Sequence, residues 1–310
     1  MTPALLGQRS GDLNKKDLGQ GGLRFVCGPL TISLEMALKV GRDEFLELYR
    51  EYPLAAPHSL ENIVDFHLKI DSPTWARRWF RPHVLPFTGA QMTPFAPLPA
   101  DLTMVTVEMG FNWQSAMVAP SHMIFHAGVI ERDGRAIIMP GASGSGKSTL
   151  SSGLAYHGWR LFSDEFGMLR LADDMMVPYP RPISLKNQSE AVMRAVAPAE
   201  RFSRPYHGTP KGTITYLLPP AGSIARMGEP AKPALLIFPV FERGATAQIQ
   251  KVSKAEAFIL VRNCSINAQW LGLPAFEALN RVVEACEAYR IIYSSLDMGK
   301  ALVDQLTAAW

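Results

Sequence analysis

The residues best suited to chemistry lie in a glycine-rich stretch near the middle of the chain. Residues 141–149 read Gly-Ala-Ser-Gly-Ser-Gly-Lys-Ser-Thr and fit the pattern G-x-x-x-x-G-K-[ST]. Glycines in such a loop let backbone N–H groups converge on an anion, and a following helix adds the positive end of its dipole. The predicted nucleotide-binding residues are Gly141, Ala142, Ser143, Gly144, Ser145, Gly146, Lys147, Ser148 and Thr149.

Two residues at the end of this loop have individual expected roles. Lys147 is a predicted catalytic residue because its ammonium reaches the terminal phosphates of a nucleotide, and the Ser148 hydroxyl is a predicted Mg²⁺ ligand. The alternative is a chance glycine-rich turn before a helix. The full motif match and its flanking pattern disfavour that alternative.

A pair of acidic residues follows the loop closely. Phosphoryl transfer needs a phosphate cradle, a divalent metal and a group that orients or deprotonates the acceptor. Asp164 and Glu165 lie one expected helix beyond Lys147, whereas a Walker B carboxylate of transport ATPases comes much later in the chain. We therefore expect these carboxylates to return beside the phosphates. A second pair, Asp173-Asp174, is expected at a solvated hairpin tip.

The elements around the loop have to hold these side chains together. Ala136–Met139 predicts a buried strand, and Ser148–His157 predicts a helix. His122–Ile130 predicts another strand that pairs with the first through the turn Arg132-Asp-Gly134. Residues 159–170 predict two short strands on either side of the acidic pair.

This arrangement resembles the HPr kinase/phosphorylase family, whose P-loop core is shared with phosphoenolpyruvate carboxykinases. The resemblance rests on residues 158–165, Gly-Trp-Arg-Leu-Phe-Ser-Asp-Glu, because in that family the loop helix ends at Gly and a short strand delivers an acidic pair. It implies that Asp164 is the general base on the acceptor hydroxyl and that Glu165 helps to hold Mg²⁺. The family usually has two aspartates, so Glu165 is a departure of one methylene that is expected to shift the metal geometry.

The family also carries a histidine on a strand before the loop, and His126 matches it. The resemblance implies that His126 is catalytic, tuning the base or contacting phosphate. A packed strand histidine is the equally weighted alternative.

A closer resemblance is to the subgroup known as HPr kinase-related kinase A, and it extends over nearly the whole chain, most weakly in the N-terminal third. The matching segments are Gly110–Trp113, His126–Gly134, Gly141–Thr149, Ser163–Glu165, Pro182–Asn187 and Lys211-Gly212. The Glu-x-Arg-Gly strand of HPr kinases proper is not recognisable, and Lys211-Gly-Thr-Ile-Thr takes its place. HPr as the acceptor, and the reverse phosphorylase reaction, are therefore left open.

Three cations after the acidic pair are candidates for phosphate or acceptor contacts. Arg181, Lys186 and Lys211 lie in Pro- or Gly-rich loops, and cations there stabilise the charge of a metaphosphate-like transition state. Simple solvated loop cations are the alternative reading. A basic–aromatic cluster at residues 75–81 is interpreted as a solvated face or a domain contact rather than a nucleic-acid site, because it is short and isolated.

Composition bounds the remaining possibilities. The 310 residues are 47% hydrophobic and 19% charged, with a formal net charge of +3, too small to indicate a nucleic-acid or membrane-surface partner. Cys27, Cys264 and Cys286 form no C-x-x-C motif, so neither a disulfide framework nor a zinc site is expected. Met1–Lys16 lacks an apolar signal segment, and no apolar run reaches the ~18 residues needed to span a bilayer. We expect a cytoplasmic protein without membrane insertion.

The predicted fold class is α/β. A small α+β N-terminal unit with a Pro-rich linker is expected over residues 1–100, followed by a P-loop kinase core of HPr kinase/phosphoenolpyruvate carboxykinase type over 101–310. Within these units Pro82–Pro99 predicts an extended connection, Leu102–Val107 a β-branched strand, and Arg201–Gly212 a polar loop.

The C-terminal third predicts strands alternating with helices. The expected elements are a strand at Ala234–Phe241, a helix at Ser253–Arg262 with a capping box from Ser253 to Glu256, a longer helix at Phe276–Tyr289, a strand at Ile291–Tyr293 and a terminal helix at Gly299–Trp310.

The function predicted from these patterns is an ATP-dependent kinase that uses ATP and Mg²⁺ and transfers the γ-phosphate to a Ser/Thr-type hydroxyl on a small protein or peptide. The alternatives are a small-molecule kinase on the same core and a non-catalytic ATP-binding regulator. A homo-oligomer is expected by resemblance alone, since HPr kinases assemble as hexamers. The sequence names neither the acceptor nor a preference for ATP over GTP.

Overall fold

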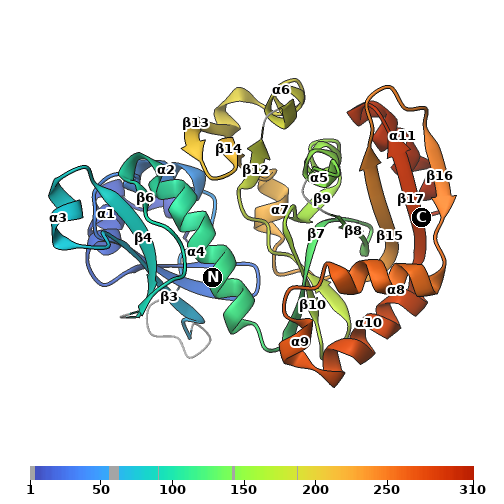
Figure 1. Cartoon of the computed structure of the whole chain (residues 1–310), viewed down its shortest axis with the longest axis horizontal. Coiled ribbons are helices and arrows are strands. Elements are labelled where there is room, and N and C mark those ends of the chain that lie inside the picture. The colour runs from blue at the N-terminus through green and yellow to red at the C-terminus, as the bar shows by residue number, and fades with distance from the viewer. Residues whose placement is uncertain (1–3, 56–62, 90, 142–143, 187) are drawn as a thin grey trace. The chain divides into compact units, whose positions relative to one another are not determined.

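The computed structural model describes residues 4–55, 63–89, 91–141, 144–186 and 188–310 (Figure 1). They form two compact units. The first comprises Met1–Val118 and Glu200–Tyr216, and the second comprises Ala119–Ala199 and Leu217–Trp310. The expected boundary at residue 100 differs from this division, because the first unit continues to Val118 and the chain returns to it once more, at Glu200–Tyr216.

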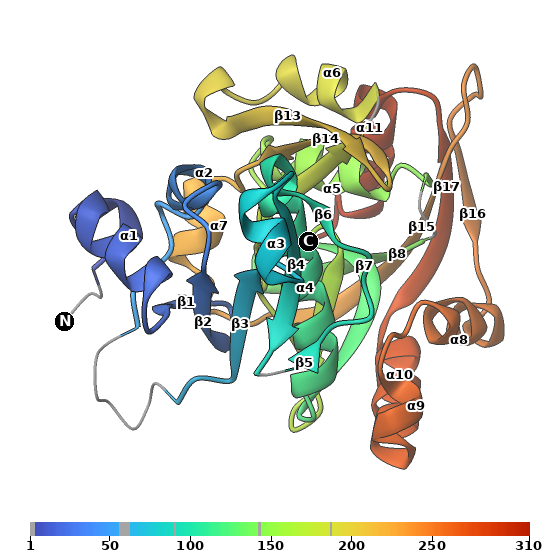
Figure 2. The ribbon, with the colours of Figure 1, turned by 60° about the vertical axis from the view of Figure 1, so that its left-hand side comes forward.

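The first unit is a mixed sheet with helices. Its elements are η1 (Leu6–Gln8), α1 (Gly11–Gly19), β1 (Leu23–Cys27), β2 (Leu30–Met36), α2 (Arg42–Leu48), β3 (Phe66–Asp71), α3 (Trp75–Trp79), β4 (His83–Thr88), β5 (Gln91–Met92), β6 (Leu98–Pro99), η3 (Ala100–Leu102), α4 (Thr103–Val118), β13 (Phe202–Thr209) and β14 (Gly212–Leu217, whose last residue belongs to the second unit). The described strands run in the order β1-β2-β3-β4-β5, with β6 beside β4 (Figure 2). Only the β2–β3 pair among them is parallel.

An aromatic cluster forms the core of this unit. The Phe25 ring meets Phe45, Tyr49, Tyr52 and Phe111 edge-on, with ring centroids 5.4–6.5 Å apart. Edge-to-face packing of buried rings adds to the free energy gained by removing their area from water. These rings join strand β1 to helices α2 and α4.

The strand predicted at Leu102–Val107 is wrong, since this segment begins helix α4. The β-branched residues disfavour a helix only weakly, and tertiary packing against β3 and β4 overrides that preference. The hydroxyl of Thr103 donates to the carbonyl of Ala100 at 2.6 Å, and that of Thr106 to Leu102 at 3.2 Å. Both threonines are thereby buried with their hydroxyls hydrogen-bonded.

Two further connections turn out to be strands. The polar segment expected as a loop at 201–212 contains β13, which pairs with β14. Ion pairs and a buried ring hold it, since Arg204 binds Glu44 at 2.7 Å, Arg201 binds Glu51 at 2.8 Å, and the buried Tyr206 packs on Tyr216. The proline-rich connection contains β4, where the carbonyl of Pro86 accepts hydrogen bonds from Thr93.

The second unit is α/β. Its elements are β7 (His122–Arg132), β8 (Arg135–Pro140), α5 (Lys147–Ala155), β9 (Arg160–Ser163), β10 (Phe166–Arg170), β11 (Met175–Val177), β12 (Ile183–Lys186), α6 (Gln188–Arg194), α7 (Ala221–Ala225), β15 (Lys232–Phe241), β16 (Gln248–Lys251), α8 (Lys254–Asn263), α9 (Ala268–Leu271), α10 (Leu273–Ala285), β17 (Glu287–Tyr293) and α11 (Leu296–Leu306), while η4 (Ala199–Arg201) spans the division. The described strands run β11-β10-β7-β8-β15-β17-β16, with β9 also on β7. Strands β8, β15 and β17 are parallel neighbours.

Helices pack on both the antiparallel and the parallel strands of this sheet. Helix α5 packs on β7, α11 packs on α5 and β17, and α10 packs on β15 and α8 (Figure 1). The predicted helix at 276–289 is placed correctly but ends earlier, at Ala285, and residues 287–293 form β17. The register of β17 against β15 decides this boundary, because Glu287 and Ala288 already pair with Leu235 and Leu236.

Candidate functional site

The glycine-rich loop connects strand β8 to helix α5, as the motif predicts. Gly144 and Gly146 both have φ of +90°, a left-handed conformation that glycine adopts without strain. Lys147 begins α5, and the carbonyl of Gly146 accepts the first helical hydrogen bond. Ala142 and Ser143 lie outside the described residues, so their predicted role stays a prediction.

The end of this loop sits directly against the ends of two strands. The N–H of Phe241 donates to the carbonyl of Ser145 at 3.1 Å. A Cβ on Gly146 would come within 2.5 Å of the Tyr293 hydroxyl and 2.9 Å of the Phe241 Cβ, so this position has room only for glycine. The hydroxyls of Ser145 and Tyr293 are buried and find no hydrogen-bond partner in the described part of the chain.

The lysine of the loop is held by the predicted histidine. His126 lies on β7 opposite Phe166, next to the residue that pairs with the end of β8. Lys147 is 6% exposed, and its Nζ lies 2.9 Å from Nε2 of His126. An ammonium donates in such a contact to an unprotonated ring nitrogen, so Nε2 of His126 is the acceptor when Lys147 is charged. The two predicted catalytic residues are therefore in direct contact.

The acidic pair lies in a tight turn between β9 and β10. The hydroxyl of Ser163 accepts hydrogen bonds from the N–H of Glu165 at 3.2 Å and of Phe166 at 2.7 Å. The carbonyl of Glu165 accepts from the N–H of Ala127, beside His126. A local serine–backbone turn of this kind satisfies the two backbone N–H groups that follow Asp164. The two short strands predicted around the pair are confirmed.

Asp164 is buried, with an exposed fraction of 6%, and the pKa of its carboxyl lies well above the ordinary value. Burial, and after it the negative charge of Glu165, raise the pKa of Asp164 to about 7, although Arg181, Lys147 and Lys186 oppose the rise. Conversely, burial lowers the pKa of Lys147, and Asp164 and Glu165 work against that change. Mutual effects of this kind place the acidic turn within electrostatic reach of the loop lysine.

The three cations predicted to contact phosphate or the acceptor lie in different parts of the structure. Arg181 is 5% exposed, with its guanidinium over the rings of Tyr179 and Phe166 at 4.9 and 5.7 Å. Lys186 is the last residue of β12, and its positive charge lowers the pKa of both Asp164 and Lys147. Lys211 lies at the β13–β14 turn of the first unit, and its predicted contact with phosphate or acceptor stays a prediction.

The residues predicted to hold a metal offer oxygen donors that suit Mg²⁺. Mg²⁺ is commonly bound through one or two carboxylates together with substrate phosphates and waters. Ser148 is half-buried at the start of α5. The negative charge of Glu165 raises the pKa of Lys147, so the Glu165 carboxylate lies near this loop. The Thr149 hydroxyl donates to the Ser189 hydroxyl at 3.0 Å. Three or more His, Cys, Asp or Glu side chains do not gather into a metal cluster among the described residues.

Sequence reasoning missed Cys264, which contributes to the same region. Its carbonyl accepts from the N–H of His126 at 2.7 Å. Burial raises the pKa of its thiol, while Lys147 and the backbone N–H of Gly141 lower it. No local pattern signals this position, because the contact depends on the turn after α8 meeting β7 and the loop.

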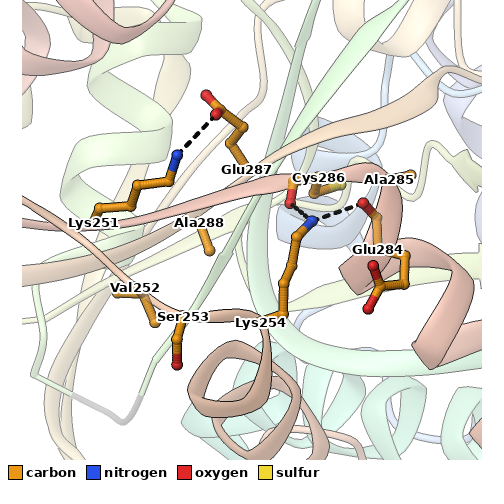
Figure 3. Close-up of a pocket in the computed structure, with 9 residues that line it drawn as sticks. All are labelled: Lys251, Val252, Ser253, Lys254, Glu284, Ala285, Cys286, Glu287 and Ala288. Carbon is orange, nitrogen blue, oxygen red and sulfur yellow. Dashed lines mark hydrogen bonds and ion pairs between the residues drawn. The ribbon is translucent and has the colours of Figure 1, made fainter.

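A separate pocket of about 550 Å³ opens between α8, β16 and the β17 edge (Figure 3). Its lysines already have partners. Lys254 donates to the carbonyls of Val283, Glu284 and Cys286, and Lys251 pairs with Glu287. The pocket contains none of the predicted site residues, and its cations serve the end of α10 and the sheet.

Comparisons with known proteins do not assign this chain to a family. The chain matches no model of a known protein family, and a search of curated proteins finds no significant match. No helix in the described ranges is both long and apolar enough to cross a bilayer.

Proposed function

We propose that this chain is an ATP-dependent kinase with an HPr kinase-like P-loop core, acting on a Ser/Thr-type hydroxyl of a small protein. The observation that carries the proposal is the buried Asp164 carboxyl, with a pKa of about 7, within electrostatic reach of the lysine that begins the loop helix. A carboxylate tuned toward neutral pH is suited to general-base catalysis, because it is ionised in part and still basic enough to take a proton.

In this proposal each described residue has a distinct task. Backbone N–H groups of the loop and the start of α5 bind the β- and γ-phosphates. The Lys147 ammonium leaves Nε2 of His126 and contacts the transferred phosphoryl group, which stabilises the charge that develops there. Asp164 accepts the proton of the acceptor hydroxyl. Arg181 and Lys186 offset the added negative charge around the reaction centre.

Magnesium fits this site through Ser148 and Glu165. When bound with the nucleotide it would supply positive charge to the phosphate oxygens. The oxygen donors come from this chain and from the nucleotide, so a metal site built from the protein alone is not required.

The test uses γ-labelled ATP with Mg²⁺, the purified full chain and a lysate of its host. We expect label on a discrete small protein, and loss of that label by at least ~100-fold in Asp164→Asn, since general-base catalysis contributes 10²–10⁴-fold. Asp173→Asn is the matched control, because this carboxylate is exposed and pairs with Arg170 on the β10–β11 turn.

The outcomes separate the alternatives. Label on a small molecule instead of a protein would indicate a small-molecule kinase. Tight ATP binding with no transfer by the native chain would indicate a regulator and refute the kinase proposal.

A further inference from the structure

The loop between β3 and β4 displays an unusual run of side chains. Every residue from 74 to 82 is exposed, including the whole of helix α3. Trp75, Trp79 and Phe80 are 82%, 75% and 71% exposed. Three adjacent large aromatic side chains turned to solvent are uncommon, since exposed apolar groups that gather in one place usually mark an interaction site. We call residues 74–82 the Trp–Arg segment.

The same segment is positively charged. It carries Arg77, Arg78 and Arg81, of which Arg78 pairs with Asp71 at 2.5 Å. Arg77 and Arg81 form no ion pair with any residue the structure describes. The Arg81 guanidinium lies 5.7 Å from the Phe80 ring centroid. Aromatic and cationic groups are thus interleaved on one short protrusion.

The segment has a defined conformation. The Thr74 side chain caps α3 by accepting from the N–H of Arg77 at 3.3 Å. At the other end Arg81 adopts φ of +45°, its carbonyl lies 2.7 Å from Nδ1 of His83, and the carbonyl of Pro82 accepts from Ala100 at 2.9 Å. Figure 1 shows α3 at the margin of the first unit, beyond its sheet. The aromatic display is therefore built into the fold of this unit.

We propose that the Trp–Arg segment binds the surface of an anionic lipid bilayer. Trp and Phe partition into the headgroup–acyl boundary, and each arginine near an anionic surface adds attraction. The headgroup phosphates complement the Arg77 and Arg81 guanidinium groups in charge and geometry. Because Trp75, Trp79 and Phe80 are each more than 70% exposed, a fluid interface can cover all three rings.

This binding is peripheral and does not depend on the nucleotide site. It needs no membrane-spanning helix, and it involves only residues of the first unit. The kinase proposal and the lipid proposal can therefore fail separately.

The test is co-sedimentation of the full chain with phosphatidylcholine vesicles that contain or lack phosphatidylglycerol, at physiological ionic strength. We expect binding only with phosphatidylglycerol, and at least ~10-fold weaker binding for both Trp75→Ala/Trp79→Ala and Arg77→Glu/Arg81→Glu. The matched control is Arg262→Glu/Trp270→Ala, since both side chains are exposed in the second unit, with Trp270 at 60%. Circular dichroism melting checks that each variant is folded.

Three results with vesicles would overturn the proposal. They are absence of vesicle binding by the native chain, equal binding with and without phosphatidylglycerol, and equal loss in the control variant. Tighter binding to RNA or to polyglutamate than to the vesicles would likewise reject lipid in favour of another polyanion.

Discussion

At the residue scale, Asp164 links function to stability. Its pKa is about 7 in the folded chain, against an ordinary value of 3.8, so the folded state binds a proton that the unfolded state has released. Stability therefore falls as pH rises from about 4 to about 7 and levels off above. A shift of this size corresponds to a cost on the order of 1–4 kcal/mol at pH 8.

Asp164→Asn removes that cost. We expect the variant to be more stable than the native chain at pH 8, to show a flatter pH dependence of stability between pH 4 and 7, and to lose phosphoryl transfer by at least ~100-fold. Urea unfolding at several pH values measures this, with Asp173→Asn as the exposed control. Equal or lower stability of Asp164→Asn at pH 8 would show that the carboxyl is not strained by its burial.

The two left-handed glycines of the loop, Gly144 and Gly146, differ in the space around them. Both have φ of +90°, but only Gly146 lacks room for a Cβ, owing to Tyr293 and Phe241. An alanine at either position costs about 1–2 kcal/mol of backbone strain. At Gly146 overpacking adds roughly 1–3 kcal/mol.

We therefore expect Gly146→Ala to lower stability and nucleotide affinity more than Gly144→Ala. Thermal unfolding and titration with a fluorescent ATP analogue measure the two effects. Adding Tyr293→Phe to Gly146→Ala should recover part of the loss, since it deletes the nearest atom. Equal effects of the two alanines would mean that the strand ends do not constrain the loop.

At the element scale, the end of helix α10 depends on a lysine from α8. Lys254 donates to three carbonyls around the last turn of α10, where the helix dipole favours a positive charge. Lys254→Met retains most of the apolar stem and removes these donors. We expect a loss of about 1 kcal/mol in chemical unfolding.

Lys251→Met is the matched control for that helix end. Lys251 forms a fully exposed pair with Glu287 in the same pocket (Figure 3), and such pairs contribute little. A loss in the control as large as that of Lys254→Met would argue against helix capping as the cause.

At the scale of the whole molecule, the chain returns to its first unit after building part of its second. Helix α4 packs on β3 and β4, which lie before residue 100. A fragment over residues 101–310 therefore exposes the buried face of α4 and leaves Arg204 of β13 without Glu44 and Arg201 of η4 without Glu51. We expect this fragment to aggregate or to unfold without cooperativity.

Size-exclusion chromatography and thermal melting of the fragment beside the full chain measure that expectation. A monomeric fragment with a cooperative transition near that of the full chain would contradict it, and would support the boundary expected from the sequence.

The sequence by itself determined the parts of this protein that depend on local chemistry. The loop from Gly141, the helix that begins at Lys147 and the short strands around the acidic pair follow from glycine conformation and short-range hydrogen bonding. The helix cap at Ser253 is likewise local, since its side chain accepts from the N–H of Glu256. Such features need only neighbours in the chain.

Only the tertiary structure decided what depends on distant partners. Three features arise where segments far apart in sequence meet. They are the contact of His126 with Lys147, the position of Cys264 and the close approach of Tyr293 to Gly146. Packing also decided that residues 103–107 are helical, because burial against a sheet outweighs the small preference of β-branched residues for strands. Long-range burial and charge carry more free energy than local propensity, and no stretch of sequence displays them.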